Sequence, residues 1–433
     1  MKRSVRPAKS LKGEVTVPGD KSISHRSVMI GGIAEGITEI ENFSNGEDCW
    51  RTVSAMQALG VKIEEAEGLL RVHGVGLHGL RPPEGEIDAG NAGTMMRLMS
   101  GILAGQRFES VLTGDEYLRR RPMRRIIEPL REMGAEIAGM EDEYPPLTIR
   151  GGGLEPIRYD MPISSAQVKS CILFAGLYAQ GRTAVIERAA SRDHTERMLR
   201  AAGATVERST LRDHEGAAVS VEGEPSLAAQ KIVVPGDLSA AAFFLVAAAL
   251  IPKSEVVLRN VGLNPSRRGV VDILRRMGAR VEVENERSVC GEPMGDLIVR
   301  GSSLKRVRIA GDIIPNVLDE IPVLAVAATQ VPGEVVIRDA ADLRAKETDR
   351  ITAVVENLRR MGAKVGEMPD GLIVEGGYVL KGAEIDSFGD HRIAMAFAIA
   401  GLLAQDEVVI DGAEWVDTSF PGFFDVLESL RVE

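Results

Sequence analysis

The sequence predicts an α/β protein with two domains, each built from three repeated units of roughly 70 residues. The chain has 433 residues, long enough for two hydrophobic cores. Six times along it, a short β-like run is followed by a polar turn and then by a long helix pattern of small and apolar residues. These copies begin at Val15, Ile87, Ile157, Lys231, Val307 and Glu384, with spacings of 70 to 77 residues.

A second pattern lies between these copies and completes the repeat. An amphipathic helix ends at a glycine, and a strand of alternating character follows it. Glycine just past a helix end favours the left-handed C-cap conformation. Each repeat is therefore predicted to contain a strand, a helix, a strand, a helix and a β-hairpin, in that order. Six copies suggest two domains of three repeats each. The alternative, unrelated βα patterns in one doubly wound sheet, leaves the regular spacing unexplained. The glycines are Gly60, Gly134, Gly203, Gly278 and Gly362.

Composition excludes several classes of function. The net charge of −11 argues against a nucleic-acid binder, although local arginines can still form an anion site. Three separated cysteines, Cys49, Cys171 and Cys290, fit a reducing compartment, and the six histidines show no metal-ligand spacing. The apolar run 240–251 is too short to span a bilayer, and no export signal follows the start. We expect a cytoplasmic protein without membrane or nucleic-acid partners.

Polar turns open five of the six apolar helices, and this favours one convergent site for anions. Helix N-termini present unpaired N–H groups and the positive end of the helix dipole, which suit phosphates and carboxylates. The fourth copy, from Gly236, is poor in such groups and is expected to be structural. The turns carry Asp20, Lys21, Ser22 and Arg26; Asn91, Gly93, Thr94 and Arg97; Ser165, Ala166 and Gln167; Asp319 and Glu320; and Asp390, His391 and Arg392.

Other charged segments are ambiguous on their own. The basic run 118–125 is more often a solvated helix face than a binding site. The segments 191–194 and 346–350 mix acids, bases and hydroxyls before helices, where capping is the commoner role. The sequence GDKS at Gly19 lacks the spacing of a nucleotide P-loop, so an ATPase is rejected.

Taken together, the motifs resemble the EPSP synthase family. GDKSISHR, GNAGT, RRRPM, SAQVK, SRDHTE, KETDR, GDHRIAMAF and SFPGFF occur in this order over essentially the whole chain. The resemblance implies the two-domain enolpyruvyl transferase fold, an inside-out α/β barrel with six βαβαββ units arranged three per domain. It places one domain at residues 20–235 and the other at 1–19 plus 236–433, with the active site in the cleft between them.

The resemblance also implies an activity. The family transfers the enolpyruvyl group of phosphoenolpyruvate to the 5-hydroxyl of shikimate 3-phosphate and releases phosphate, without a metal or cofactor. The sister transferase that acts on UDP-N-acetylglucosamine is the alternative, but it typically has Lys-Asn near its start and a cysteine in the mobile loop. Here Lys21 and Ser22 form the pair, and the stretch 119–122 contains no cysteine. A non-catalytic scaffold is a further alternative, but it would not need these acids and arginines.

Family roles transfer to matching positions. The resemblance implies that shikimate 3-phosphate contacts Lys21, Ser22, Arg26, Ser165, Ala166, Gln167, Arg192, Asp319, Asp342 and Lys346. It implies that phosphoenolpyruvate contacts Lys21, Asn91, Gly93, Arg121, Gln167, Arg350 and Arg392. It assigns catalysis to Asp319, Glu347 and Lys21.

Three positions depart from family patterns. Asp342 stands where asparagine is frequent, and Thr418 stands where some class I members have a lysine. Ser266 replaces a threonine of the class II pattern, which GDKS, SAQVK and RDHTE otherwise resemble, so the class stays open. The protein is expected to be a monomer. Glyphosate is expected to inhibit it, since Gly93 occupies the position where family resistance often traces to alanine.

Overall fold

The computed structural model describes residues 1–211 and 216–432. Its internal contacts divide the chain into two compact units. Unit 1 contains Met1–Pro18, Pro235–Arg287 and Pro293–Glu433, and unit 2 contains Gly19–Val234 together with Ser288–Glu292. The chain therefore passes from one unit to the other four times, at residues 18/19, 234/235, 287/288 and 292/293.

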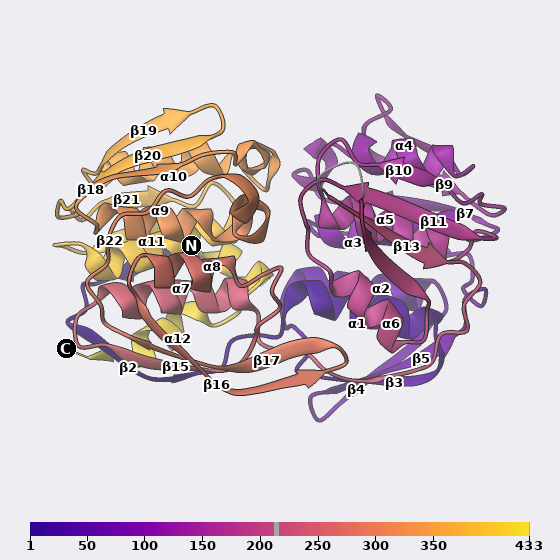
Figure 1. Ribbon diagram of the computed structural model, residues 1–433, viewed down its shortest axis with the longest axis horizontal. Coiled ribbons are helices and arrows are strands. Elements are labelled where there is room, and N and C mark those ends of the chain that lie inside the picture. Colours follow the sequence, from indigo (N-terminus) through magenta and orange to yellow (C-terminus); the bar gives the residue numbers. More distant parts are fainter. Residues whose placement is uncertain (212–215, 433) are drawn as a thin grey trace. The chain divides into compact units, whose positions relative to one another are not determined.

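Unit 2 contains three four-stranded sheets of the same topology, each with two helices (Figure 1). In each sheet the first two strands are parallel, and the remaining strands pair antiparallel to them. The first sheet is β14 (Lys231–Val233), β3 (Glu35–Glu41), β5 (Leu69–Val75) and β4 (Lys62–Ala66), with α1 (Lys21–Ile33) and α2 (Glu47–Ala58). The second is β6 (Ile87–Asp88), β7 (Glu109–Thr113), β9 (Tyr144–Arg150) and β8 (Glu136–Met140), with α3 (Gly93–Ala104) and α4 (Arg124–Glu132). The third is β10 (Arg158–Asp160), β11 (Arg182–Glu187), β13 (Ala217–Glu222) and β12 (Val206–Thr210), with α5 (Ala166–Gly176) and α6 (His194–Ala201).

Unit 1 repeats the arrangement with variations. One sheet joins β16 (Arg280–Val289), β17 (Glu292–Arg300), β15 (Glu255–Gly262), β2 (Ser10–Val15) and β23 (Arg431–Val432), with α7 (Leu238–Leu250) and α8 (Gly269–Arg276). The next joins β18 (Gly333–Ile337), β20 (Gly371–Gly376) and β19 (Lys364–Met368), with α9 (Ile321–Thr329) and α10 (Arg350–Arg360). The last joins β1 (Lys2–Val5), β22 (Val408–Asp411) and β21 (Glu384–Asp386), with α11 (His391–Leu403) and α12 (Phe423–Ser429). Short 3-10 turns lie at η1 (Leu118–Arg120), η2 (Gly311–Asn316), η3 (Leu318–Glu320), η4 (Ala341–Ala345) and η5 (Ala413–Thr418).

Some strands pair outside the repeat that their sequence position suggests. Strand β2 precedes α1 in the chain but pairs with β15, and β14 precedes α7 but pairs with β3. The fifth repeat keeps only an isolated bridge, Ile309 to Ile337, in place of its first strand. Within its described residues, up to 432, the sixth repeat shows no hairpin of its own, since β1 pairs with β22 and β23 pairs with β2. Residues 2–5 and 431–432 are thereby held in sheets.

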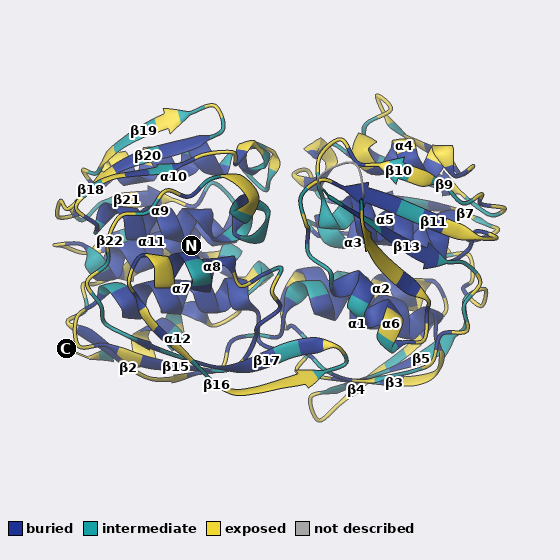
Figure 2. Ribbon diagram, in the orientation of Figure 1, coloured by how far each residue is buried: buried dark blue, intermediate teal, exposed yellow. Residues whose placement is uncertain are grey.

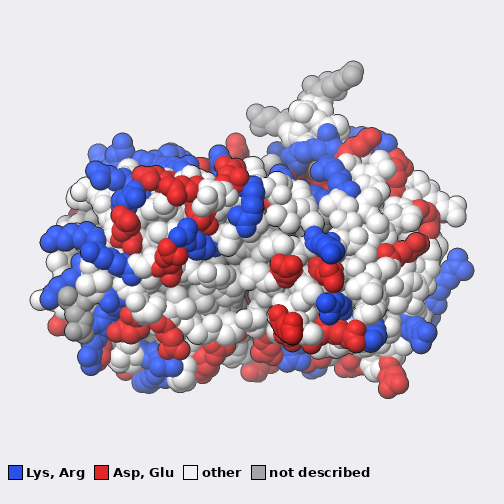
Figure 3. Space-filling view, turned by 90° about the horizontal axis from the view of Figure 1, so that it is seen from below, with Lys and Arg blue, Asp and Glu red and all other residues white. Residues whose placement is uncertain are grey.

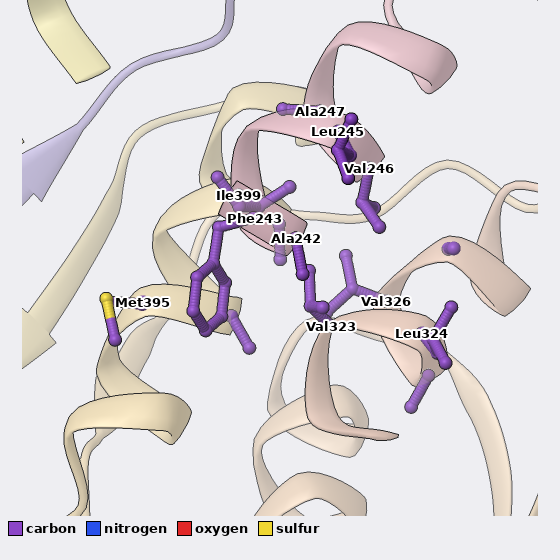
Figure 4. Packing of buried hydrophobic residues seen from close by; sticks show 14 of the residues in the cluster. Ala242, Phe243, Leu245, Val246, Ala247, Val323, Leu324, Val326, Met395 and Ile399 are labelled. Carbon is purple, nitrogen blue, oxygen red and sulfur yellow. The ribbon is translucent and has the colours of Figure 1, made fainter. Parts of the chain in front are cut away.

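The first helix of each repeat is buried on all sides, as the sequence predicts. In α7 every residue except Leu250 is buried, and in α11 every residue except Leu403 is buried (Figure 2). Helices α7, α9 and α11 contact one another, and Figure 4 shows Phe243, Val323 and Met395 in their shared core. A helix apolar on every face is stable in water only when other elements cover every face. Polar groups that such a helix carries to a binding site are therefore expected near its ends or bonded to buried partners.

The helix ends follow the sequence signals. Side chains of Asp20, Ser165, Asp237 and Asp390 accept a backbone N–H from the first turn of α1, α5, α7 and α11. Such caps satisfy donors that the helix itself leaves unpaired. The five predicted C-cap glycines all have positive φ, between 78° and 101°, where a side chain would be strained.

Within residues 1–211 and 216–432, no helix is long and apolar enough to cross a membrane. On the face drawn in Figure 3, acidic and basic side chains are intermixed, without a broad basic patch.

Candidate active site

In unit 2, the helices α1, α3 and α5 bring their N-terminal ends together. Arg26 of α1 donates from Nη2 to Ser170 Oγ of α5 at 2.8 Å. Arg97 of α3 donates from Nη1 to Gln167 Oε1 at 2.9 Å, and Gln167 Nε2 donates to Thr94 Oγ1 at 2.9 Å. These bonds join the first two turns of the three helices. Their unpaired N–H groups and positive dipole ends therefore face one region of unit 2.

Arg26 is held rigidly within this region. Its side chain is buried, and it also donates to the Ser22 carbonyl at 2.8 Å and to Thr195 Oγ1 of α6 at 2.6 Å. Burial lowers the pKa of Arg26 to about 10, so the guanidinium stays charged at neutral pH. The side chain thus fixes α1, α5 and α6 relative to one another while keeping a positive charge beside Ser22.

Lys21, the first residue of α1, forms an ion pair with Asp48 of α2 at 2.7 Å. Both side chains are largely buried. The neighbouring His25 is buried against Thr52, 2.6 Å from Nδ1 to Oγ1. Burial, together with the charges of Lys21 and Arg26, holds the pKa of His25 well below its ordinary value, so this imidazole is neutral. Asp48 therefore orients the Lys21 ammonium in this structure.

Gly93 lies directly beside two guanidinium groups. A Cβ added to it would lie 3.0 Å from Cζ and Nη1 of Arg121 and 3.0 Å from Nη1 of Arg97. Arg121, from the basic run 118–125, is buried, while Arg119, Arg120 and the start of α4 are exposed. Arg121 is therefore the one arginine of that run that is buried, and it lies beside Gly93. Asn91 is oriented by its bond to Asp115, from Nδ2 to Oδ2 at 3.0 Å.

In unit 1, a second group of charged residues surrounds Arg350, whose side chain is 1% exposed. Its Nη2 donates to Glu347 Oε2 at 2.6 Å, and its Nη1 donates to Asp319 Oδ1 at 3.2 Å. Its Nε donates to Asp390 Oδ2 at 2.7 Å. Burial alone would lower the pKa of Arg350, but the carboxylates of Asp390, Glu347 and Asp319 outweigh it and raise the pKa. We call these four residues the Arg350 cluster.

Arg392 is held less closely than Arg350. Its Nη1 lies 3.4 Å from the Asp319 carbonyl and 4.0 Å from Glu320 Oε1, and its Nη2 lies 3.9 Å from Asp319 Oδ2. It is the second residue of α11, and its backbone N–H is capped by Asp390. Contacts this long are weak, so an incoming anion can compete for this guanidinium.

Lys346 is a further charged residue of unit 1 that lies close to Asp319. Its Nζ lies 3.7 Å from Asp319 Oδ1. The segment 341–349 is held by Arg344, which bonds Asp349 at 2.7 Å and the Met368 carbonyl at 2.7 Å. Asp342 lies on η4 of the same segment and is half-buried. The positions of Lys346 and Glu347 thus depend on a loop anchored to the β19–β20 hairpin.

The two groups differ in charge and so in chemistry. The unit 2 group contains the cations Lys21, Arg26, Arg97 and Arg121 around helix N-termini, which suits phosphate binding. The Arg350 cluster has three carboxylates around one guanidinium. Two of them, Asp319 and Glu347, are partly exposed at 13% and 18%, which suits proton transfer to a ligand.

The predicted residues thus fall into two sets, one in each unit. Lys21, Ser22, Arg26, Asn91, Gly93, Arg121, Ser165, Ala166, Gln167 and Arg192 lie in unit 2, and Asp319, Asp342, Lys346, Glu347, Arg350 and Arg392 lie in unit 1. Sequence reasoning missed Asp48 and Asp390 as partners of Lys21 and Arg350. Asp390 could have been found from its place in the GDHR turn, but no local pattern marks Asp48. Among the described residues, no group of His, Cys, Asp and Glu side chains could hold a metal ion.

A two-unit α/β fold of repeated βαβαββ elements, with arginines and carboxylates at the starts of buried helices, defines the enolpyruvyl transferase class. Residues 5–427 match the sequence model of EPSP synthase (3-phosphoshikimate 1-carboxyvinyltransferase). The 3-phosphoshikimate 1-carboxyvinyltransferases of Desulforamulus reducens and Brevibacillus brevis are 50% and 53% identical, with 100% and 98% of both chains covered. The solved EPSP synthase of Acinetobacter baumannii is 46% identical, has a TM-score of 0.87, and is matched over 99% of this chain and 98% of its own.

The chain therefore belongs to the EPSP synthase family, and the predicted fold class is confirmed. It is an enzyme of the shikimate pathway that transfers the enolpyruvyl group of phosphoenolpyruvate to shikimate 3-phosphate. The same matches favour this reading over the UDP-N-acetylglucosamine transferase considered above.

The Arg350 cluster generates a prediction about stability. Asp390→Asn keeps the cap of α11 but removes the buried charge that faces Arg350. Breaking a buried ion pair typically costs about 3–5 kcal/mol when the remaining charge has no partner. Glu347 and Asp319 still bond Arg350, so we expect the unfolding free energy of unit 1 to fall by up to about that amount. Urea unfolding followed by Trp415 fluorescence, in a Trp50→Phe background, measures unit 1 because the chain has two tryptophans, one in each unit.

Asp349→Asn is the matched control. Asp349 also caps a helix, α10, and also pairs with an arginine, Arg344, but its side chain is 35% exposed. An exposed pair contributes about 0–1 kcal/mol, so this variant should be nearly neutral. Equal losses in the two variants would contradict the special role given to the buried pair.

Proposed function

We propose that unit 2 binds shikimate 3-phosphate through Lys21, Ser22, Arg26, Ser165, Ala166, Gln167 and Arg192. The support is the convergence of capped helix starts with fixed cations. Ser165 caps α5 through the Val168 N–H, and the positive end of the helix dipole favours an anion at this helix start. Arg26 supplies a permanent charge close to it. Asp319, Asp342 and Lys346 of unit 1 contact the same substrate, Lys346 as a cation and the two aspartates as acceptors for its hydroxyls.

Phosphoenolpyruvate is bound by Lys21, Asn91, Gly93, Arg121, Gln167, Arg350 and Arg392. Arginine forks match carboxylate and phosphate geometry and remain charged. Arg392 is the main candidate for the carboxylate, because its present contacts are long. Four of the five N–H groups of Arg350 already bond carboxylates, so its larger role is to orient Asp319 and Glu347.

Asp319 and Glu347 act as the acid and base of the transfer, with Lys21 beside the reacting centre. The 5-hydroxyl of shikimate 3-phosphate attacks C2 of phosphoenolpyruvate, its proton passes to a carboxylate, and C3 gains a proton from an acid. The tetrahedral adduct then loses phosphate and one C3 proton. One observation carries the assignment: Arg350 bonds both carboxylates, so both are fixed relative to the same guanidinium.

Exchanging the acids should separate chemistry from binding. Glu347→Gln and Asp319→Asn keep shape but abolish proton exchange, so kcat should fall about 10²-fold or more. Arg192→Ala should instead raise KM for shikimate 3-phosphate, because it removes binding shared by ground and transition states. The measurement is steady-state phosphate release with both substrates varied.

Arg188→Ala serves as the control for Arg192→Ala, since Arg188 lies in the same loop but is exposed. It should leave both constants unchanged. A Glu347→Gln enzyme with near-normal kcat would refute the acid–base assignment.

Both sets of residues act on one pair of substrates, in a cleft between the domain of residues 20–235 and that of 1–19 plus 236–433. Binding of shikimate 3-phosphate closes the cleft, brings the Arg350 cluster to the reacting atoms and excludes water. The protein works as a cytoplasmic monomer, and its three cysteines, all free thiols, suit a reducing compartment.

Small-angle scattering tests closure and oligomeric state together. The forward scattering should correspond to 46.6 kDa, and the radius of gyration should fall when shikimate 3-phosphate is added. An unchanged radius at saturating substrate would count against closure, and a doubled mass would refute the monomer.

Glyphosate inhibits the enzyme by occupying the phosphoenolpyruvate site beside Gly93. A methyl group at Gly93 would press on the guanidinium tips of Arg121 and Arg97 at 3.0 Å. The methyl group would also push into a long ligand that lies extended along this wall. Tight overlap of that kind commonly costs about 1–3 kcal/mol, or roughly a 5- to 150-fold loss of affinity. Phosphoenolpyruvate is shorter and should be affected less. We expect Gly93→Ala to raise Ki for glyphosate more than KM for phosphoenolpyruvate.

Gly85→Ala is a suitable control, because a Cβ there meets nothing within 4 Å. Its Ki should equal that of the unmodified enzyme. A millimolar Ki in the unmodified enzyme that Gly93→Ala does not change would overturn this proposal.

A further inference from the structure

Lys169 is a fully buried lysine that the proposed chemistry does not use. It lies on α5, two residues after Gln167, and its side chain has no exposed surface. Its Nζ lies 2.7 Å from Glu196 Oε1 of α6 and 3.0 Å from Glu187 Oε2 at the end of β11. Both carboxylates are also buried, at 2% and 0% exposed. An ammonium taken out of water in this way needs such partners.

The Lys169 contacts converge on the loop between β11 and α6, residues 188–193. Nζ of Lys169 also donates to the Ser191 carbonyl at 3.4 Å. The carboxylate of Glu187 accepts from the Ser191 backbone N–H at 3.1 Å and from Ser191 Oγ at 2.6 Å. At the other end of the loop, Ala189 N–H donates to Ser164 Oγ at 3.1 Å. The loop is thus anchored at Ala189 and at Ser191, and Arg192 is the residue directly after Ser191.

The charges of this group balance without a ligand. Glu187 Oε1 accepts from Arg208 Nη1 of β12 at 2.8 Å, so Lys169 and Arg208 offset Glu187 and Glu196. Burial alone would raise the pKa of Glu187, but Lys169 and the Ser191 donors outweigh it and lower the pKa. The carboxylate therefore stays ionised and keeps accepting from the loop.

We propose that Lys169 is a positioning residue for shikimate 3-phosphate: through Glu187 and Ser191 it sets the place of Arg192 relative to Ser165–Gln167. The inference rests on the proposed binding of shikimate 3-phosphate by those residues. It joins two motifs, since Lys169 belongs to SAQVK and Glu196 to SRDHTE. Helix α5 thus contributes both the helix start proposed to bind the substrate and the Lys169 ammonium, which contacts the loop 188–193.

The first test compares Lys169→Met with the double variant Lys169→Met/Glu196→Gln. The single variant leaves two buried carboxylates facing an apolar side chain, so it should lose stability. Urea unfolding followed by Trp50 fluorescence, in a Trp415→Phe background, measures this loss for unit 2. The double variant removes the excess charge and should recover part of that stability. In both, KM for shikimate 3-phosphate should rise by about 10-fold or more, the cost of misplaced hydrogen bonds to a charged ligand. KM for phosphoenolpyruvate and kcat should change far less.

This comparison separates positioning from simple stabilisation. A structural role alone predicts that KM follows stability, so that the double variant regains both. The inference would be overturned by a folded double variant whose KM for shikimate 3-phosphate lies within a factor of about two of that of the unmodified enzyme. A change that small is less than the loss of one hydrogen bond to a charged ligand would cause.

Ser191→Ala keeps the test decisive if the lysine variants do not fold. It removes only the Oγ bond to Glu187, and it should raise KM for shikimate 3-phosphate several-fold at unchanged kcat. Ser100→Ala is the matched control, since Ser100 is buried in unit 2 but bonds Met96 of its own helix at 2.8 Å. Equal KM values in these two variants would refute the positioning role.

Arg192→Ala separates the proposed binding role of Arg192 from the proposed positioning role of Lys169. If Arg192→Ala raises KM for shikimate 3-phosphate but the Lys169 and Ser191 variants do not, the binding assignment stands and the positioning role fails. If Arg192→Ala has no effect on KM, the binding assignment itself fails.

Discussion

The burial of helices that are apolar on every face is the constraint on which the rest of this structure depends. Such a helix must be covered on all sides, and the sheets and outer helices of each repeat supply that cover. The charged side chains of these helices then lie within the first two turns, while a few buried hydroxyls further along bond within the protein. In unit 2 this places the caps Asp20 and Ser165 beside Lys21 and Gln167, where backbone N–H groups already favour anions.

Charged groups near these ends, and Arg350 at the start of the outer helix α10, are largely or fully buried, and each needs a partner within the protein. Lys21 has Asp48, Arg350 has three carboxylates, and Lys169 has Glu187 and Glu196. These pairs keep the site rigid before any substrate binds, so less ordering remains to be done on binding. The two groups also differ in charge, since cations prevail in the unit 2 group and carboxylates prevail around Arg350 in unit 1.

Much of the fold could be predicted from the sequence, because local residue patterns indicate its helices, strands and turns. The repeat spacing, the apolar helices, and the C-cap glycines need only neighbouring residues. The exchange of β2 and β14 between repeats could not be predicted, since strand propensity does not specify a partner. The pairs Lys21–Asp48 and Arg350–Asp390 join residues 27 and 40 positions apart, which only the folded chain brings together.

Hydrogen exchange followed by mass spectrometry tests the central claim most directly, namely that helix starts in both units receive the substrates. Shikimate 3-phosphate alone should slow exchange at the starts of α1 and α5 and in the loop 188–193. Addition of glyphosate or phosphoenolpyruvate should extend protection to η3, η4 and the start of α11. Protection confined to one unit with both ligands present, or found on the outer hairpins instead, would contradict the account.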